Sequence, residues 1–266
     1  MRAIEPSATG LVTRNDSSVA YEDFGAGEQT LLFLPPWSIV HSRIWKAQVP
    51  YFARHYRVLT LDPVGNGASD RPHDPARYTE REFAADALAV MDATGTERAV
   101  VISLSLGGLR ALTLAAEHPE RVSALGFIAP SVPLTPGHPM RGQYSFDELL
   151  PTEEGWAKYN RHYWKKDYRG FLEFFFSQMF PEPHSTKQID DCVGWGLETT
   201  PDVLIATKLA PFPSREQTLE LCRRIRCPVL VLHGDQDAIV PHARGAALAR
   251  QTGGRLVTLQ GSGHGP

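Results

Sequence analysis

The run from Val100 to Leu114 constrains the fold of this chain more than any other segment. It begins with a short apolar stretch of the kind that forms a buried strand, and it ends in a helical pattern of leucine and alanine. Ser105 lies between the two, with Gly107 and Gly108 shortly after it. Small residues at this place indicate a sharp strand-to-helix turn whose backbone lies close to its neighbours. We therefore expect the Ser105 hydroxyl to stand at a strand end, beside helix amide groups that favour developing negative charge.

Short apolar runs alternate with longer helical patterns along most of the chain. The clearest helix spans residues 79–94, because Thr79 and Glu82 have the spacing of a capping box and Gly95 supplies a stop. Uninterrupted apolar runs suit strands that are buried on both faces, as in a mainly parallel sheet. We expect strands over residues 31–34, 57–61, 99–102, 124–128, 228–232 and 254–259, further helices over 107–117 and 241–251, and an edge hairpin over 11–24.

This alternation breaks between residues 131 and 213, where no strand pattern is visible. The stretch reads as helices and loops and is rich in aromatic side chains, such as Trp156, Trp164 and Phe175. Two interpretations stay open and are compatible: the rings pack small helices against the core, or they line an apolar pocket beneath a lid. We expect residues 1–130 and 214–266 to form the core and residues 131–213 to form a helical cap, or lid.

The segment around Ser105 resembles the nucleophile elbow of the α/β-hydrolase superfamily, and further landmarks follow in that family's order. The run from Leu61 to Pro72 looks like the family's D-x-x-G-x-G-x-S-D-x-P loop, in which Asp62 has a structural role. The resemblance extends from about residue 31 to residue 264, except for the cap. It implies an α/β-hydrolase fold, which is a mainly parallel central sheet flanked by helices with a helical cap insertion.

The end of the chain departs from the family pattern. Pro266 lies two residues after His264, whereas relatives usually continue for one more helix that packs on the sheet. We therefore expect the final C-terminal helix to be absent from this chain. The early end suggests either a shortened chain or one part of a longer polypeptide with further domains on its C-terminal side.

The resemblance implies a catalytic triad of Ser105, Asp237 and His264. Asp237 stands four residues before Pro241, at the family's acid position, whereas Asp235 better suits a turn cap. His264 lies between two glycines on the loop expected after the last strand. A serine hydroxyl needs a base, and the base needs an orienting group, so the three residues together supply what nucleophilic attack on an acyl carbon requires.

The family also implies two backbone N–H groups that form an oxyanion hole, and here they are assigned to Leu106 and Trp37. Relatives usually carry His-Gly where this chain has Pro35 and Pro36, and proline has no N–H to donate. The next residue, Trp37, keeps its N–H, and its indole is expected to narrow the pocket. We expect Trp37 and His41 to contact the substrate.

Composition excludes several other classes of protein. The formal net charge of −3 gives no bias toward nucleic acid, and no apolar run approaches the length of about 20 residues that a membrane helix needs. The N-terminus has no secretory signal pattern, so we expect a cytoplasmic protein without a nucleic-acid or membrane partner. Three cysteines without paired spacing do not suggest a zinc site, and we expect no metal and no cofactor.

The sequence therefore predicts a serine hydrolase that cleaves a carboxylic ester or thioester of a small-to-medium apolar acyl substrate through an acyl-enzyme. A hydrolase of carbon–carbon bonds or an acyltransferase would use the same triad. A non-catalytic ligand-binding or regulatory domain of a larger protein is the alternative outside catalysis. Fold-level likeness does not choose among substrates, and the oligomeric state stays open.

Overall fold

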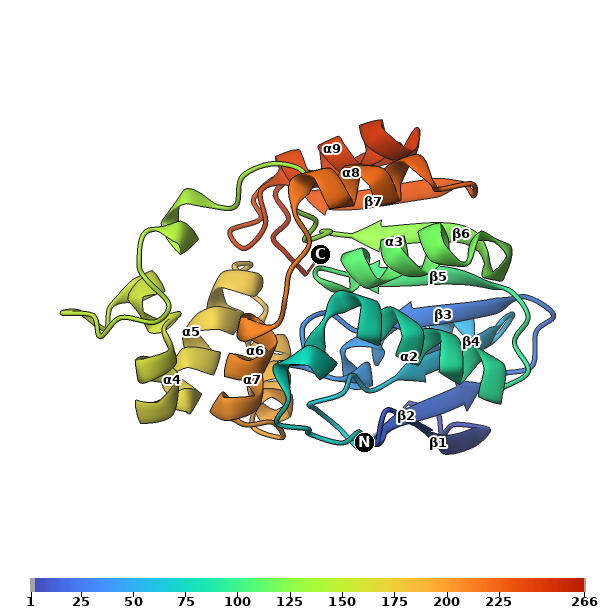
Figure 1. The fold of residues 1–266 in the computed structure, drawn as a ribbon, viewed down its shortest axis with the longest axis horizontal. Helices are drawn as coiled ribbons and strands as arrows, with labels where there is room; N and C mark the ends of the chain where they lie inside the picture. The colour runs from blue at the N-terminus through green and yellow to red at the C-terminus, as the bar shows by residue number, and fades with distance from the viewer. Residues whose placement is uncertain (1–2, 266) are drawn as a thin grey trace.

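A single sheet lies at the centre of the computed structural model, which describes residues 3–265 (Figure 1). Within these residues eight strands pair in the order β1-β2-β4-β3-β5-β6-β7-β8. The hairpin of β1 and β2 pairs antiparallel, as does β2 with β4, and all other neighbours are parallel. The predicted mainly parallel sheet and edge hairpin are thus confirmed. The strands are β1 (Ala8–Arg14), β2 (Ser17–Phe24), β3 (Thr30–Leu34), β4 (Arg57–Leu61), β5 (Ala99–Leu104), β6 (Val122–Ile128), β7 (Val229–Gly234) and β8 (Arg255–Leu259).

Four helices lie side by side across one face of the sheet (Figure 1). They are α2 (Glu80–Ala93), α3 (Gly107–Glu117), α8 (Arg215–Arg223) and α9 (His242–Thr252), while the short α1 (Gln48–Phe52) packs beside β4. Helix α2 begins where the capping pattern predicts, because the Thr79 hydroxyl accepts a hydrogen bond from the Glu82 N–H at 3.3 Å. Gly95 follows its end with a φ of +62°, a conformation that glycine adopts without strain.

Both faces of the central strands are buried, as their uninterrupted apolar runs predict. In β3, Leu32 faces the core cluster under α2 and α3, whereas Leu31 and Phe33 belong to the cluster on the opposite face. Each of these side chains is at most 5% exposed. Burial of one such side chain contributes about 1.5–3 kcal/mol, so the two faces together fix the position of the strand ends where the site lies.

The segment from residue 131 to residue 213, here called the cap segment, contains four helices that lie beyond one end of the sheet (Figure 1, left). Its rings pack against one another, with Trp164 and Phe171 fully buried and their centroids 4.6 Å apart. Helix α8 packs instead beside α3 and α9. The division into residues 1–130, 131–213 and 214–266 stays a prediction. The cap helices are α4 (Arg161–Lys166), α5 (Tyr168–Met179), α6 (Thr186–Gly196) and α7 (Pro201–Leu209).

Short 3-10 helices complete the described elements: η1 (Ser42–Trp45), η2 (Pro75–Tyr78), η3 (Pro119–Arg121), η4 (Pro139–Gly142) and η5 (Gly155–Lys158). After β8 the chain passes through a turn and reaches Gly265 without a further helix. No helix between residues 3 and 265 has both the length and the apolar character that crossing a bilayer requires.

Candidate active site

Ser105 occupies a strained turn at the end of β5. Its φ of +55° lies in the left-handed region, which costs a residue with a side chain about 1–3 kcal/mol. Backbone hydrogen bonds hold this conformation: the Ser105 N–H donates to the Ile128 carbonyl at 2.9 Å, and the Ser105 carbonyl accepts from Ser131 at 2.8 Å and Gly108 at 3.0 Å. The turn is therefore fixed both by the end of β6 and by the start of α3, and it has the form predicted for a nucleophile elbow.

The small residues around this turn are required by close backbone approach. A Cβ on Gly107 would lie 2.5 Å from the Pro35 carbonyl oxygen, which is closer than side-chain carbons approach other atoms in real structures. Helix α3 thus starts directly against the loop that follows β3. Ser103, where the family more often has glycine, is fully buried and its hydroxyl donates to the Gly126 carbonyl at 3.3 Å. This hydrogen bond explains why a serine fits there.

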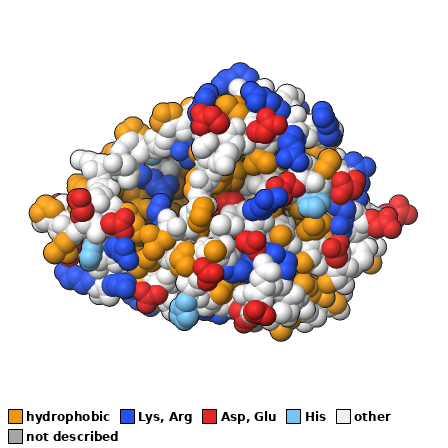
Figure 2. Space-filling model, in the orientation of Figure 1, with side chains coloured by type: hydrophobic (Ala, Val, Ile, Leu, Met, Phe, Trp, Pro, Cys, Tyr) orange, Lys and Arg blue, Asp and Glu red, His pale blue; other side chains and the backbone are white. Residues whose placement is uncertain are grey.

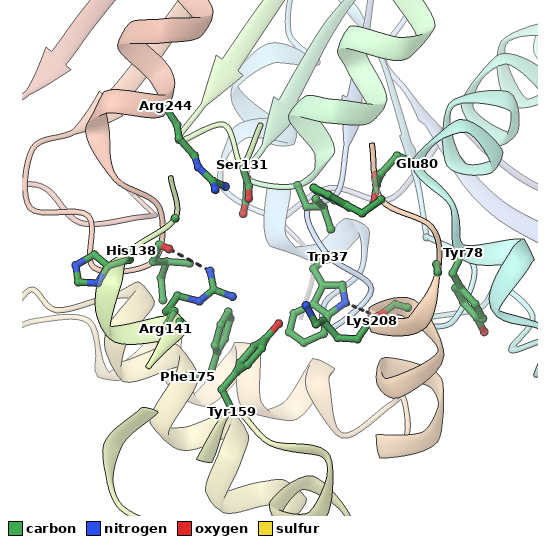
Figure 3. A pocket seen from close by; sticks show the side chains of 18 of the residues that line it. Trp37, Tyr78, Glu80, Ser131, His138, Arg141, Tyr159, Phe175, Lys208 and Arg244 are labelled. Atoms are coloured by element: carbon green, nitrogen blue, oxygen red, sulfur yellow. Dashed lines mark hydrogen bonds between the residues drawn. The ribbon is translucent and has the colours of Figure 1, made fainter. Parts of the chain in front are cut away.

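The Ser105 side chain faces a cavity of about 440 Å³ between the core and the cap segment. Figure 3 shows the cavity with Trp37, Tyr159 and Phe175 on its walls. Leu106 lines the same cavity. Within residues 3–265 the Ser105 hydroxyl makes no hydrogen bond, so none joins it to His264. Catalytic hydrogen bonds are often long without substrate and tighten in the reacting complex.

Asp237 and His264 meet on the loops after β7 and β8. The His264 Nδ1 lies 2.7 Å from the Asp237 Oδ2, and both side chains are buried. The other carboxylate oxygen accepts backbone N–H groups of Ile239 and Val240, each at 2.8 Å. Because the carboxylate accepts the Nδ1 proton, the Nε2 of His264 is left as the basic nitrogen.

His233 adds a further contact that the sequence did not indicate. Its Nε2 lies 3.0 Å from the same Asp237 oxygen that contacts His264, and its side chain is fully buried. Burial opposes ionisation of Asp237, but the charge of His264 and the hydrogen bonds from His233, His264 and Val240 together hold the pKa of Asp237 well below its usual value. The acid therefore stays ionised and able to orient His264.

The loop that carries His264 is attached to the cap segment. The His264 N–H donates to the Met179 carbonyl at 3.2 Å, and the Gly263 N–H donates to the Glu182 carboxylate at 2.8 Å. Gly234, at the end of β7, permits the loop to pass closely, since a Cβ there would lie 2.2 Å from the Ser262 carbonyl oxygen. The position of the histidine thus depends on the strand ends and on the cap together.

The two backbone N–H groups that are assigned to the oxyanion hole are not engaged by acceptors in the described part of the chain. Neither the Trp37 N–H nor the Leu106 N–H donates a hydrogen bond to any group in the described part of the chain. Arg110 restrains the two prolines before Trp37, because its Nη1 donates to the Pro36 carbonyl at 2.8 Å and to the Pro35 carbonyl at 3.3 Å. The loop therefore has a rigid support despite its two prolines.

Arg110 in turn forms a buried ion pair with Glu80, with its Nε 2.9 Å from the carboxylate. Burial raises the pKa of Glu80, while the charge and hydrogen bond of Arg110 act in the opposite direction. No local pattern of residues predicts this pair, because its partners lie on different helices, α2 and α3. The ion pair anchors the loop from Pro35 to Trp37.

The Trp37 side chain lies on the wall of the cavity, and its indole N–H donates to the Thr207 hydroxyl at 2.7 Å. This fixes the ring between the core and α7. His41 is placed differently from the expectation, since it does not line this cavity. Its ring lies 3.6 Å from Asp62 and 3.4 Å from Glu198, because it caps the start of η1 and turns toward the outer end of the cap segment. His41 is therefore not part of the wall beside Ser105, and its contact with the substrate stays a prediction.

Three cationic side chains on the cavity wall were missed by the sequence reasoning. Arg141, Lys208 and Arg244 come from η4, from the last turn of α7 and from the first turn of α9. Nothing in the local pattern of the chain links these distant segments. Among residues 3–265 no cluster of three histidine, cysteine or acidic side chains is arranged to hold a metal ion.

The mainly parallel sheet, the strained serine at the end of β5 and the loops after β7 and β8 define an α/β-hydrolase type of protein. The sequence model of the family described as alpha/beta hydrolase fold matches residues 30–152, and that of TAP-like protein matches residues 177–266. The chain belongs to the α/β-hydrolase superfamily, and its class is that of the hydrolytic enzymes.

Named relatives agree with this membership. 2-Hydroxymuconate semialdehyde hydrolase of Pseudomonas sp. (strain CF600) is 29% identical over 77% of this chain and 68% of the relative. Pimeloyl-(acyl-carrier protein) methyl ester esterase of Edwardsiella ictaluri (strain 93-146) is 33% identical, over 43% of this chain and 42% of that enzyme. A solved hydrolase from Pseudomonas aeruginosa PA01 superposes with a TM-score of 0.74 at 26% identity, covering 97% of this chain and 92% of that chain.

Proposed function

We propose that this chain is a serine hydrolase that cleaves a carboxylic ester or thioester of a small-to-medium apolar substrate, with Ser105, His264 and Asp237 as its triad. The observation that carries the proposal is the strained Ser105, whose hydroxyl faces the cavity without a hydrogen-bond partner in the described chain. Strain of this kind persists where the surrounding structure maintains it, and it concentrates at functional sites. The relative named as a methyl ester esterase supports the reaction class.

The reaction begins with attack of the Ser105 oxygen on the acyl carbon while the His264 Nε2 takes the hydroxyl proton. The negative charge that forms on the carbonyl oxygen is bound by the N–H groups of Leu106 and Trp37. Collapse of this intermediate breaks the bond to the leaving oxygen or sulfur, which receives the proton from His264. Water then attacks the acyl-enzyme through the same steps and releases the acid, while Asp237 orients His264 throughout.

The walls of the cavity support an apolar substrate of limited size. Its volume of about 440 Å³ lies within the range of small-molecule sites, which is about 300–1,000 Å³. Trp37, Tyr159 and Phe175 present their rings to it. A polymer would not fit in this volume, whereas a short acyl chain would bury its carbon atoms against the rings.

The test is labelling by a fluorophosphonate probe together with turnover of 4-nitrophenyl esters of increasing chain length. The wild-type chain should be labelled, and Ser105→Ala should lose both labelling and turnover. Ser131→Ala is the matched control, because Ser131 lines the same cavity and its N–H donates to the Ser105 carbonyl, but it is not assigned as nucleophile. A folded wild-type chain that is neither labelled nor active would indicate a non-catalytic binding domain instead.

Hydrolysis of a carbon–carbon bond is the second candidate, and it is favoured by the relative named 2-hydroxymuconate semialdehyde hydrolase, whose alignment covers 77% of this chain. The same triad would serve this reaction. The two candidates are separated by comparing kcat/KM for a 4-nitrophenyl ester with that for a ring-cleavage product of the dienoate type. A value for the dienoate at least tenfold above that for the best ester would replace the ester proposal with this one.

A further inference from the structure

The cavity beside Ser105 carries an excess of positive charge. Arg141, Lys208 and Arg244 line it, and the one acidic side chain on its wall, Glu80, is engaged by Arg110. None of the three cations forms an ion pair with any residue between 3 and 265. Figure 2 shows blue side chains inside the hollow on the left of the molecule.

Arg141 is held in place by contacts that leave part of its guanidinium unengaged. Its Nη1 donates to the Ile239 carbonyl at 3.0 Å, and its central carbon lies 5.3 Å from the Trp156 ring and 5.0 Å from the Tyr159 ring. The other guanidinium nitrogens have no hydrogen-bond acceptor within residues 3–265. In Figure 3 the side chain extends into the cavity.

Arg244 points into the same space from the opposite wall (Figure 3). Its Nε donates to the Thr135 carbonyl at 3.1 Å, which leaves its two terminal nitrogens without an acceptor in the described chain. Burial and the nearby charge of Arg141 both lower the pKa of Arg244. The positive charges of Arg141 and Arg244 therefore repel each other in a partly buried place. An anion bound between them would offset this repulsion.

Guanidinium groups with free N–H pairs match the planar oxygens of a carboxylate, and they bind it through two parallel hydrogen bonds. The amino group of Lys208 adds charge on the cavity wall, 5.8 Å from the Tyr159 ring. A carboxylate is smaller than a phosphate or sulfonate group, so it leaves most of the 440 Å³ for the carbon chain.

We propose that the substrate carries a carboxylate, which Arg141 and Arg244 bind on the side of the cavity away from Trp37 (Figure 3). This inference rests on the proposed function and narrows its substrate class from apolar esters to monoesters of carboxylate-bearing acids or alcohols. The two arginines select the substrate, and the triad performs the reaction.

The kinetic test compares two charged esters with their neutral methyl-capped counterparts. 4-Nitrophenyl hemiglutarate carries the charge on the acyl side, and 4-carboxyphenyl pentanoate carries it on the leaving group. We expect kcat/KM for at least one charged ester to exceed that of its neutral counterpart by about tenfold or more, as for a charge-assisted hydrogen-bonded pair. Arg141→Met and Arg244→Met should each remove most of this preference, measured as the ratio of kcat/KM for a charged ester to that for its neutral counterpart. The control is Arg250→Met, on the exposed part of the same helix as Arg244.

A binding measurement separates this inference from the proposed function. Titration calorimetry of Ser105→Ala with monomethyl glutarate, dimethyl glutarate and propyl phosphate reports anion binding without turnover. Binding of monomethyl glutarate that both arginine variants abolish would support the site even if no ester were hydrolysed. Equal rates and affinities for charged and neutral compounds would overturn the carboxylate site. The same holds if both arginine variants keep the wild-type preference for the charged compounds. Tighter arginine-dependent binding of the phosphate would overturn the choice of a carboxylate.

Discussion

Substitution of Gly107 by alanine tests whether the start of α3 positions the oxyanion loop. The added Cβ would lie 2.5 Å from the Pro35 carbonyl oxygen, about 0.9 Å short of ordinary van der Waals contact, which begins at 3.4 Å. The Pro35 oxygen is a backbone atom, so it cannot move aside as the end of a flexible side chain could. Arg110 restrains the same carbonyl from behind, and the loop must therefore shift together with the Trp37 N–H two residues later.

The magnitude follows from the size of that shift. A displacement of about 1 Å at a catalytic group reduces the rate by about 100-fold, and loss of one oxyanion donor reduces it by about 100- to 1,000-fold. We expect kcat of Gly107→Ala on 4-nitrophenyl butyrate to fall by about 100-fold with KM changed less than about threefold. Overpacking at this contact should lower the free energy of unfolding by about 1–3 kcal/mol.

The measurements are steady-state kinetics and urea unfolding of the same preparations. Gly194→Ala is the matched control, because Gly194 lies within α6 and an added Cβ there meets no atom within 4 Å. This control should keep the wild-type kcat and gain about 0.5–1 kcal/mol of stability from its helical position. A folded Gly107→Ala variant with kcat within twofold of wild type would refute the argument that this glycine sets the oxyanion geometry.

Two further predictions concern buried polar contacts. His233→Phe removes a hydrogen bond to Asp237, whose depressed pKa means that the carboxylate contributes stability above about pH 4 and loses it on acidification. The stability difference from wild type, measured by urea unfolding between pH 1.5 and 7, should be about 1.5–3 kcal/mol at pH 4 and above and should shrink only at lower pH, where the carboxyl of the folded variant takes up a proton before that of wild type; a constant difference over the whole range would contradict it. Arg110→Met leaves Glu80 buried without its partner and should cost about 3–5 kcal/mol of unfolding free energy, part of which the double variant with Glu80→Gln restores. If the double variant were no more stable than the single one, the pairing argument would fail.

The parts of this molecule that the sequence predicts well are those fixed by neighbouring residues. The elbow around Ser105 is local, since a strand, two glycines and a helix within fifteen positions allow few other conformations. The capped start of α2 at Thr79 is local in the same sense. The contact of Asp237 with His264 is long-range, but the order of strands brings both loops to one edge of the sheet.

The parts that the sequence does not reveal depend on packing between distant segments. The expectation for His41 rested on its place in a loop near Trp37, and the start of η1 turns its ring toward Asp62 instead. Arg110 appears in the sequence as an ordinary residue of an apolar helix, and its contact with Glu80 exists only when α2 and α3 are side by side. No periodicity or motif encodes such a pair.

In the proposed function, the site draws its chemistry and its selectivity from different parts of the chain. Ser105, Asp237 and Leu106 are fixed by strand ends of the core, so substitutions there should change the rate for every substrate alike. Arg141 belongs to the cap segment and Arg244 to core helix α9. An anion bound by both would join the cap to the core beside the loop of His264, whose N–H already donates a hydrogen bond to the Met179 carbonyl of the cap segment. Binding of the charged end of the substrate would thereby also hold the base in position, which couples recognition of the substrate to the geometry of the reaction.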